Sequence, residues 1–235
     1  SENRTYMECV PYYDRTDYVA AVSNVFGYLL GVEALTGIEV PRRAQYIRVM
    51  MTEFNRIASH LLWLATHAID IGAMTIFLYC FREREEILKL FEALFGARLT
   101  THAFRVGGLW KDLPPGFEKA ARAFLSDFPS KIEEYEQILT NNRIWLDRTV
   151  GIGVISGEEA IEWGMSGPPL RGSGVAYDVR KARPYGGYEE FDFEISVRHK
   201  GDTYDRYLVR LDELRQSMRI IEQVLEGLPE GPIRG

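Results

Sequence analysis

One helical pattern sets the fold class of this chain. Residues 40–74, VPRRAQYIRVMMTEFNRIASHLLWLATHAIDIGAM, begin near Pro41, which suits a first turn, and their apolar residues then recur at helical intervals. A helix of this length is typical of the central member of a bundle. We therefore predict a mainly α fold, a helical bundle built around this long helix.

Further helices are predicted on both sides of it. The earlier pattern begins at Asp14, a possible N-cap, has Tyr18 near its start and ends at Gly37. Residues 81–96 form an amphipathic pattern that ends at Gly96, and residues 202–228 form a final one. Between these, the patterns at 117–128 and 129–150 predict two separate helices.

Sequence pattern and composition divide the chain into three segments. Residues 1–150 are predicted to form the helical core, and residues 204–235 a C-terminal helix. Residues 151–203 are rich in Gly, Pro and Tyr, which predicts an irregular α+β segment with turns, short helices and a strand pair around residues 191–198 and Gly201. The sequence GIGVISG at its start lacks a Walker lysine and follows a helix, so we interpret it as a turn.

Charge and cysteine content exclude some functions. The 28 Lys+Arg and 34 Asp+Glu give a net charge of −6, and no dense basic run occurs, which argues against a nucleic-acid partner. Cys9 and Cys80 are the two cysteines and form no CxxC, so this chain alone is not expected to hold an iron–sulfur cluster. None of the four histidines has a Glu three residues before it, and HExxH is absent, so no di-iron or zinc site is predicted.

The most apolar stretch carries ionisable groups. Residues 60–80, HLLWLATHAIDIGAMTIFLYC, contain His60, His67 and Asp70. An aspartate at the centre of a membrane-spanning helix costs roughly 2.5–3.5 kcal/mol, and five charged residues follow from Arg82 to Glu86. We therefore predict a helix that is buried in protein.

Two polar tracks follow from the helical spacing. Leu62, Thr66 and Asp70 are spaced i, i+4 and i+8 and so share one face. If Asp70 is buried it needs a cation, a histidine or several donors, and such groups occur both in structural pairs and at functional sites.

The second track is Glu53, His60 and His67, with Arg56 beside it. For His60 we favour a core histidine that hydrogen-bonds a neighbouring helix over a ligand, because buried polar groups normally have partners. The same interpretation applies to His67. Tyr18 is either an ordinary half-buried aromatic residue or a hydroxyl donor to a pocket.

Several long blocks resemble one family. They are DRTDY, EVPRRAQYIRV, THAIDIGAMT, YCFREREEIL, LTNNRIWLDRTVGIGV, LRGSGVAYDVRKARPYGGYEEFDF and GDTYDRYLVRLDELRQSMRII. Together they resemble the D subunit, or 49 kDa subunit, of respiratory complex I, the proton-pumping NADH:quinone oxidoreductase. The resemblance covers essentially the whole chain. It implies a fold related to the large subunit of nickel–iron hydrogenases, without the metal-binding cysteines.

The resemblance assigns roles to four residues. Tyr18 falls on the tyrosine that hydrogen-bonds a quinone carbonyl, and Asp70 on the aspartate that pairs with a quinone-contacting histidine. Thr66 and Leu62 fall on positions that line the quinone pocket. The partner histidine is expected on an N-terminal hairpin upstream of Ser1, and a C-terminal portion is expected after Gly235, so the chain is predicted to be a fragment that does not act alone.

The resemblance also implies partners. Quinone is the substrate, and the electrons come from an iron–sulfur cluster in the neighbouring B subunit. The C subunit and the membrane-arm subunits are further expected partners, on the cytoplasmic side of the cell membrane. Electron transfer would be coupled there to proton translocation. In one place the chain departs from the family, because Thr100 stands where many members have a histidine, and His102 follows two residues later.

Two other functions remain compatible with the sequence. The chain could be a hydrogenase-related subunit of another membrane-bound oxidoreductase, such as a ferredoxin-linked or formate-linked complex. It could also be a helical scaffold that docks partners without contacting a ligand.

Overall fold

The computed structural model describes residues 2–235 and is mainly helical, as predicted. The α-helices are α1 (Tyr6–Tyr13), α2 (Ala21–Thr36), α3 (Arg42–Ile71), α4 (Met74–Phe95), α5 (Phe117–Leu139), α6 (Arg143–Thr149), α7 (Gly157–Glu162), α8 (Gly167–Gly172), α9 (Val179–Ala182) and α10 (Thr203–Gly227). A short 3₁₀ helix η1 (Tyr188–Glu190) and the strands β1 (Phe104–Arg105) and β2 (Gly108–Leu109) complete the described elements.

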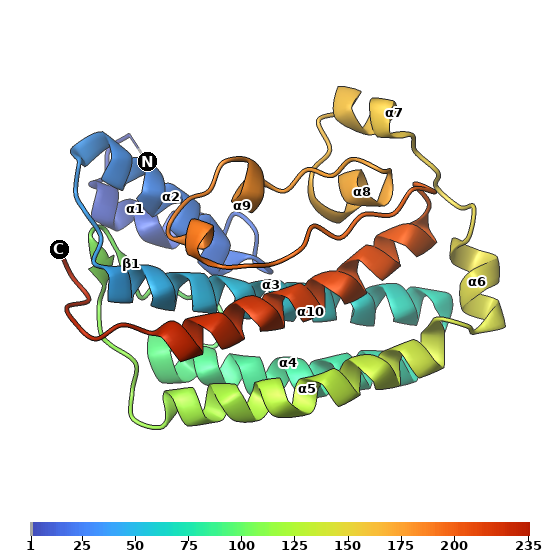
Figure 1. The fold of residues 1–235 in the computed structure, drawn as a ribbon, viewed down its shortest axis with the longest axis horizontal. Helices are drawn as coiled ribbons and strands as arrows, with labels where there is room; N and C mark the ends of the chain where they lie inside the picture. The colour runs from blue at the N-terminus through green and yellow to red at the C-terminus, as the bar shows by residue number, and fades with distance from the viewer. Residues whose placement is uncertain (1) are drawn as a thin grey trace.

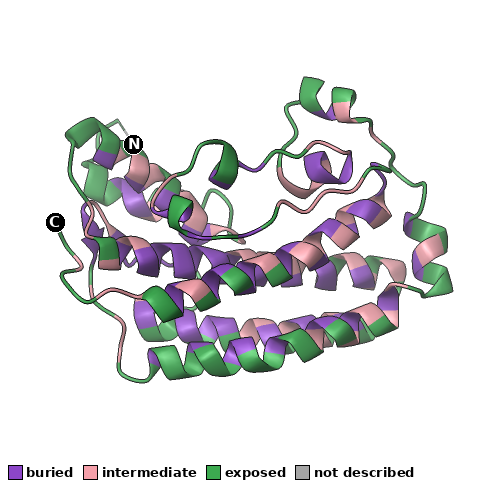
Figure 2. Ribbon diagram, viewed as in Figure 1, coloured by how far each residue is buried: buried purple, intermediate pink, exposed green. Residues whose placement is uncertain are grey.

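The long helices form a bundle around α3. Helix α3 packs against α4 and α10, and α5 packs against both α4 and α10 (Figure 1). Helices α1 and α2 lie at one end of the bundle, and α6, α7 and α8 lie at the other. Buried residues follow the inner faces of the long helices (Figure 2). The 30-residue length of α3 confirms the predicted central helix, and its start after Pro41 confirms the predicted boundary.

The apolar stretch 60–80 is a helical hairpin. Helix α3 ends at Gly72, which adopts φ 102°, a left-handed conformation that favours glycine. Ala73 N–H then donates to the Ala68 carbonyl, and α4 begins at Met74. Helix α4 therefore starts seven residues before the predicted position 81. Across residues 2–235, none of the helices combines the length and the apolarity that a membrane span requires.

The helix predicted from Asp14 to Gly37 is shorter than expected, because α2 covers only Ala21–Thr36 and a turn that follows α1 occupies residues 14–20. Asp14 is the C-cap of α1, and α2 begins at Ala21, so the predicted N-cap is wrong. The intervening turn is held by Asp17, whose Oδ1 accepts from Val19 N–H at 3.0 Å and whose carbonyl accepts from Ala20 N–H at 3.1 Å. These local bonds compete with helical ones. Gly37 ends α2 as predicted.

The helices predicted at 117–128 and 129–150 have a different boundary. Helix α5 runs through Pro129 to Leu139 because its buried stripe, which packs toward α4, continues across the proline. The break comes at Asn142, whose Oδ1 accepts from Ile144 N–H at 2.9 Å and caps α6.

The strand pair predicted around residues 191–198 is absent from the structure that residues 2–235 form. Asp192 N–H donates to Gln223 Oε1 and Glu194 N–H to Gln216 Oε1, each at 2.9 Å, so side chains of α10 take the place of a partner strand. The two-stranded sheet instead pairs Phe104 with Leu109. The loop after α6 is a turn, as predicted, and the division into three segments stays a prediction.

Candidate functional site

Three predicted site residues lie on one face of α3. Thr66 Oγ1 donates to the Leu62 carbonyl at 3.0 Å, one turn earlier, and Asp70 follows one turn later. Leu62 is partly exposed, and Thr66 and Asp70 are exposed. The expectation that Asp70 is buried is therefore wrong for this chain, because α4 and α10 pack on other faces of α3. The face forms an open surface with a carboxylate at one end.

Tyr18 lies in the turn between α1 and α2, and 79% of its surface is exposed. The prediction placed Tyr18 near the start of a helix, and that placement is wrong because the residue precedes α2. Asn55 of α3 anchors this turn: its Oδ1 accepts from Val22 N–H at 3.1 Å and from Ser23 N–H at 3.3 Å, and its Nδ2 donates to the Val19 carbonyl at 2.9 Å.

Asn55 ties the tyrosine turn to the predicted face. Seven residues are almost two helical turns, so Asn55 lies on nearly the same face of α3 as Leu62, roughly 10 Å away along the axis. The turn that carries Tyr18 is thus fixed beyond one end of the open face, and Asp70 lies at the other end. Among the described residues, no hydrogen bond joins the Tyr18 side chain to Thr66 or Asp70.

The second polar track enters a buried charge network. Glu53 of α3 accepts hydrogen bonds from Arg56 at 3.1 Å, Arg180 at 3.0 Å, Tyr188 at 2.5 Å and Ser217 at 2.6 Å. Burial raises the pKa of this carboxyl, but the two guanidinium charges and the two hydroxyl donors outweigh it and set the pKa at about 2. Glu53 is therefore a fully paired buried anion.

His60 is a core histidine bonded to a neighbouring helix, as predicted. Its Nε2 lies 2.7 Å from Glu213 Oε2 on α10. Arg171 of α8 also donates to Glu213, from Nε at 2.9 Å and from Nη2 at 2.5 Å. Burial raises the pKa of Glu213, but His60 and Arg171 hold it well below its usual range.

Sequence reasoning missed the arginines of this network. Arg171 and Arg180 are buried and belong to the Gly-rich segment that the sequence identified as irregular. Arg180 also donates to Asp178 at 2.7 Å, so this guanidinium pairs with two buried carboxylates, those of Glu53 and Asp178. No periodicity marks such residues, because the segment has no regular repeat to place them on a face.

His67 differs from His60. Its ring stacks on Trp63 with centroids 4.8 Å apart and meets Trp145 of α6 edge to face at 5.4 Å. Its Nε2 is buried and has no hydrogen-bond partner among residues 2–235. Burial lowers the pKa of His67, Arg210 lowers it further and Asp70 opposes both.

The sequence has Thr100 where many family members have a histidine, and His102 lies two residues later, in the segment after α4. His102 Nδ1 lies 3.2 Å from the buried Asp14 carboxylate and 3.0 Å from the Thr100 carbonyl. Thr100 itself adopts φ 53°. His102 therefore helps to join the end of α1 to the segment after α4.

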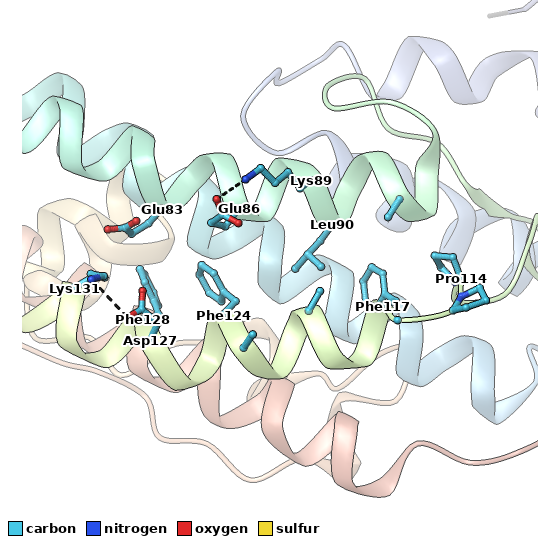
Figure 3. A pocket seen from close by; sticks show the side chains of 15 residues that line it. Glu83, Glu86, Lys89, Leu90, Pro114, Phe117, Phe124, Asp127, Phe128 and Lys131 are labelled. Atoms are coloured by element: carbon cyan, nitrogen blue, oxygen red, sulfur yellow. Dashed lines mark hydrogen bonds and ion pairs between the residues drawn. The ribbon is translucent and has the colours of Figure 1, made fainter.

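A sizeable cavity lies away from the predicted site residues. It has a volume of about 620 Å³ and runs between α4 and α5, over an apolar floor that includes Leu90, Phe117, Phe124 and Phe128 (Figure 3). Lys89 pairs with Glu86 at its rim, and Lys131 with Asp127. None of the predicted site residues lines it.

Within residues 2–235, no three His, Cys, Asp or Glu side chains come together as metal ligands would. Cys9 and Cys80 are both buried. Most of the charged and polar side chains described above bond one another or face solvent, and the buried Nε2 of His67 is an exception.

The comparisons with known proteins agree on one family. Residues 70–235 match the family model described as the respiratory-chain NADH dehydrogenase, 49 Kd subunit. The D subunit 2 of the NADH-quinone oxidoreductase of Solibacter usitatus is 60% identical over 235 residues, which are 100% of this chain and 64% of the relative. The D subunit of the NADH-quinone oxidoreductase of Geotalea uraniireducens is 56% identical over 233 residues, which are 99% of this chain and 60% of that protein.

The chain thus spans less than two thirds of the length of these relatives. The similarity to these relatives covers all the long helices of the bundle, and the family model covers the chain from Asp70, near the end of α3, onward. This chain belongs to the family of the 49 kDa subunit of respiratory-chain NADH dehydrogenase, also called the D subunit of NADH-quinone oxidoreductase.

Proposed function

We propose that this chain forms part of the quinone-reduction site of an NADH:quinone oxidoreductase. The observation that carries the proposal is the open face of α3, where Leu62, Thr66 and Asp70 follow one another and Asn55 anchors the turn of Tyr18 beyond the first of them. The relatives, which are named as D subunits of NADH-quinone oxidoreductases, support the substrate class.

Each residue has a chemical task in this proposal. The Tyr18 hydroxyl donates a hydrogen bond to one quinone carbonyl and supplies a proton as the oxygen gains charge. Leu62 contacts the apolar part of the quinone, and Thr66 lies between the two polar ends. Asp70 supplies the negative charge that orients and stabilises a cationic partner at the second carbonyl.

The proposal extends to partners. An iron–sulfur cluster in the neighbouring B subunit would supply the electrons, with the C subunit and membrane-arm subunits completing the assembly on the cytoplasmic side of the membrane. The change in charge around Asp70 on reduction would couple electron transfer to proton translocation.

Tyr18→Phe in the complete complex tests the proposal. The rate of NADH oxidation with quinone should fall by roughly 10²-fold, while the rate with an artificial acceptor that takes electrons upstream stays unchanged. Tyr12→Phe is the matched control, because Tyr12 is also an exposed tyrosine near the same turn. Equal quinone rates for both variants would contradict the role of Tyr18.

A further inference from the structure

Next to Asp70, on the adjoining face of α3, His67 has a buried ring nitrogen that no described residue satisfies. Buried polar atoms are nearly always hydrogen-bonded, and exceptions often mark functional groups. The His67 ring is held on two sides, by Trp63 within α3 and by Trp145 from α6, so its position is fixed by packing alone. Trp145 Nε1 is likewise buried without a partner among these residues.

The charges around His67 come from two helices. Asp70, three residues later on α3, attracts a proton to the imidazole, and side chains three apart on a helix have Cβ atoms about 5–6 Å apart. From α10, Arg210 and Arg206 repel that proton. From α6, Trp145 brings no charge, and Arg148 donates to the Ile71 carbonyl at 3.2 Å.

Arg210 is the cation that acts most strongly on the His67 proton. Its guanidinium lies 3.9 Å from the centroid of the Trp63 ring, on which His67 also stacks. Its Nη1 donates to the Arg206 carbonyl at 2.9 Å, and no carboxylate pairs with it in the described part of the chain. Burial lowers the pKa of Arg210 to about 10, so Arg210 remains a cation at neutral pH. Arg210 and Asp70 thus act with opposite sign on the proton of the His67 imidazole, a group that ordinarily titrates near neutral pH.

We propose that His67 carries protons to Asp70 during quinone reduction, an inference that rests on the proposed function. The neutral imidazole takes a proton from a solvent hydronium ion, which leaves water, and the resulting imidazolium gives a proton to the Asp70 carboxylate as an N–H bond breaks and an O–H bond forms. The proton passes on toward the quinone, which takes two electrons from the partner subunit's cluster and two protons in all. His67 acts through Asp70 and does not contact the quinone.

His67→Gln in the complete complex tests this step, with NADH oxidation by quinone measured from pH 5 to pH 8. The protonated fraction of His67 falls tenfold for each pH unit above its lowered pKa. The ratio of wild-type to variant rate should therefore be largest at acidic pH, roughly tenfold or more, and should shrink as the pH rises. Added imidazole should partly restore the rate of His67→Ala. His199→Gln, at an exposed histidine of the irregular segment, is the matched control.

The outcomes separate this inference from the proposed function. Asp70→Asn is measured beside His67→Gln, and the rate with the artificial acceptor reports assembly of both. If Asp70→Asn loses the quinone rate while the His67→Gln ratio is the same at every pH and imidazole has no effect, His67 is only a packing residue and the inference falls. If Asp70→Asn keeps the full quinone rate, the proposed function falls, and the inference falls with it.

Discussion

His60 Nε2 on α3 and Glu213 Oε2 on α10 lie 2.7 Å apart in the helical core. The pair joins the two helices beside Arg171, which donates to the other oxygen of the same carboxylate. Burial, with the charges of Arg210 and Arg56, lowers the pKa of His60 against the opposing effect of Glu213, so at neutral pH a neutral imidazole meets a carboxylate. The pair therefore holds the two helices together as a hydrogen bond more than as an ion pair.

We expect His60→Ala to lower the free energy of unfolding by about 1–3 kcal/mol, because Glu213 keeps Arg171 but loses one donor. His60→Gln can still donate to Glu213 and should lose less. Urea denaturation of the chain at pH 7 measures both. Equal losses would indicate that the cavity left by the ring, rather than the hydrogen bond, sets the cost.

Glu53 predicts an acid-dependent loss of stability. Its pKa is about 2 in the folded chain and about 4.5 when it is unfolded, so the unfolded state binds the proton more readily. The contribution of the ionised carboxylate is fully present above about pH 4.5 and is lost as the pH falls toward 2. It amounts to about 3 kcal/mol.

Glu53→Gln should lower the free energy of unfolding by about 3–5 kcal/mol at pH 7, because it leaves buried Arg180 short of a counter-charge. The difference from wild type should shrink between pH 4.5 and pH 2. Glu222→Gln, at an exposed position of α10, is the control and should show no such change. A difference that is constant with pH would contradict the assignment.

Sequence periodicity was sufficient to predict α3, but it misplaced the start of α4 and the end of α5 and did not predict the structure of the segments between the helices. Helix α3 could be predicted because its buried face repeats at helical intervals over many turns. The turn at Tyr18 depends on local bonds of Asp17 and on Asn55, which lies more than thirty residues later in the chain. Likewise, the extended segment near Asp192 is bonded by side chains of α10.

The same limit applies to the candidate site. Helical spacing placed Leu62, Thr66 and Asp70 on one face, and the structure confirms that placement. The exposure of Asp70 depends on which faces of α3 the other helices cover, and one sequence does not specify that packing. The arginines that neutralise Glu53 and Glu213 come from an irregular segment, so spacing gave no signal for them.

Two glycines allow a test of how the irregular segment packs. Gly201 and Gly164 have nearly the same left-handed φ, 66° and 65°. A Cβ on Gly201 would lie 2.1 Å from the Ile155 carbonyl oxygen, whereas a Cβ on Gly164 would meet nothing within 4 Å. Both alanine variants carry the left-handed strain of about 1–2 kcal/mol, and Gly201→Ala should lose about 1–3 kcal/mol more. If thermal unfolding shows that the two variants lose equal stability, the turn at residues 151–155 can shift to accommodate the new Cβ at no cost.

Asn55 offers a test of the link between fold and site. Its side chain makes one hydrogen bond to the turn that carries Tyr18, at the Val19 carbonyl, and two to the start of α2 directly after it, at the N–H groups of Val22 and Ser23. Asn55→Leu removes all three and should release the turn from α3. In the proposed function the Tyr18 hydroxyl donates to a quinone and must be held in place, so we expect the quinone rate of the complete complex to fall roughly tenfold or more, since small misplacements of reacting groups are costly.

Asn55→Asp separates anchoring from simple destabilisation. It keeps the acceptor for the N–H groups of Val22 and Ser23, but it loses the donor to the Val19 carbonyl. Its quinone rate should therefore lie between those of Asn55→Leu and wild type, with the artificial-acceptor rate unchanged in all three. If Asn55→Leu instead lowers both rates in parallel, the residue supports assembly of the complex and the position of Tyr18 does not depend on it.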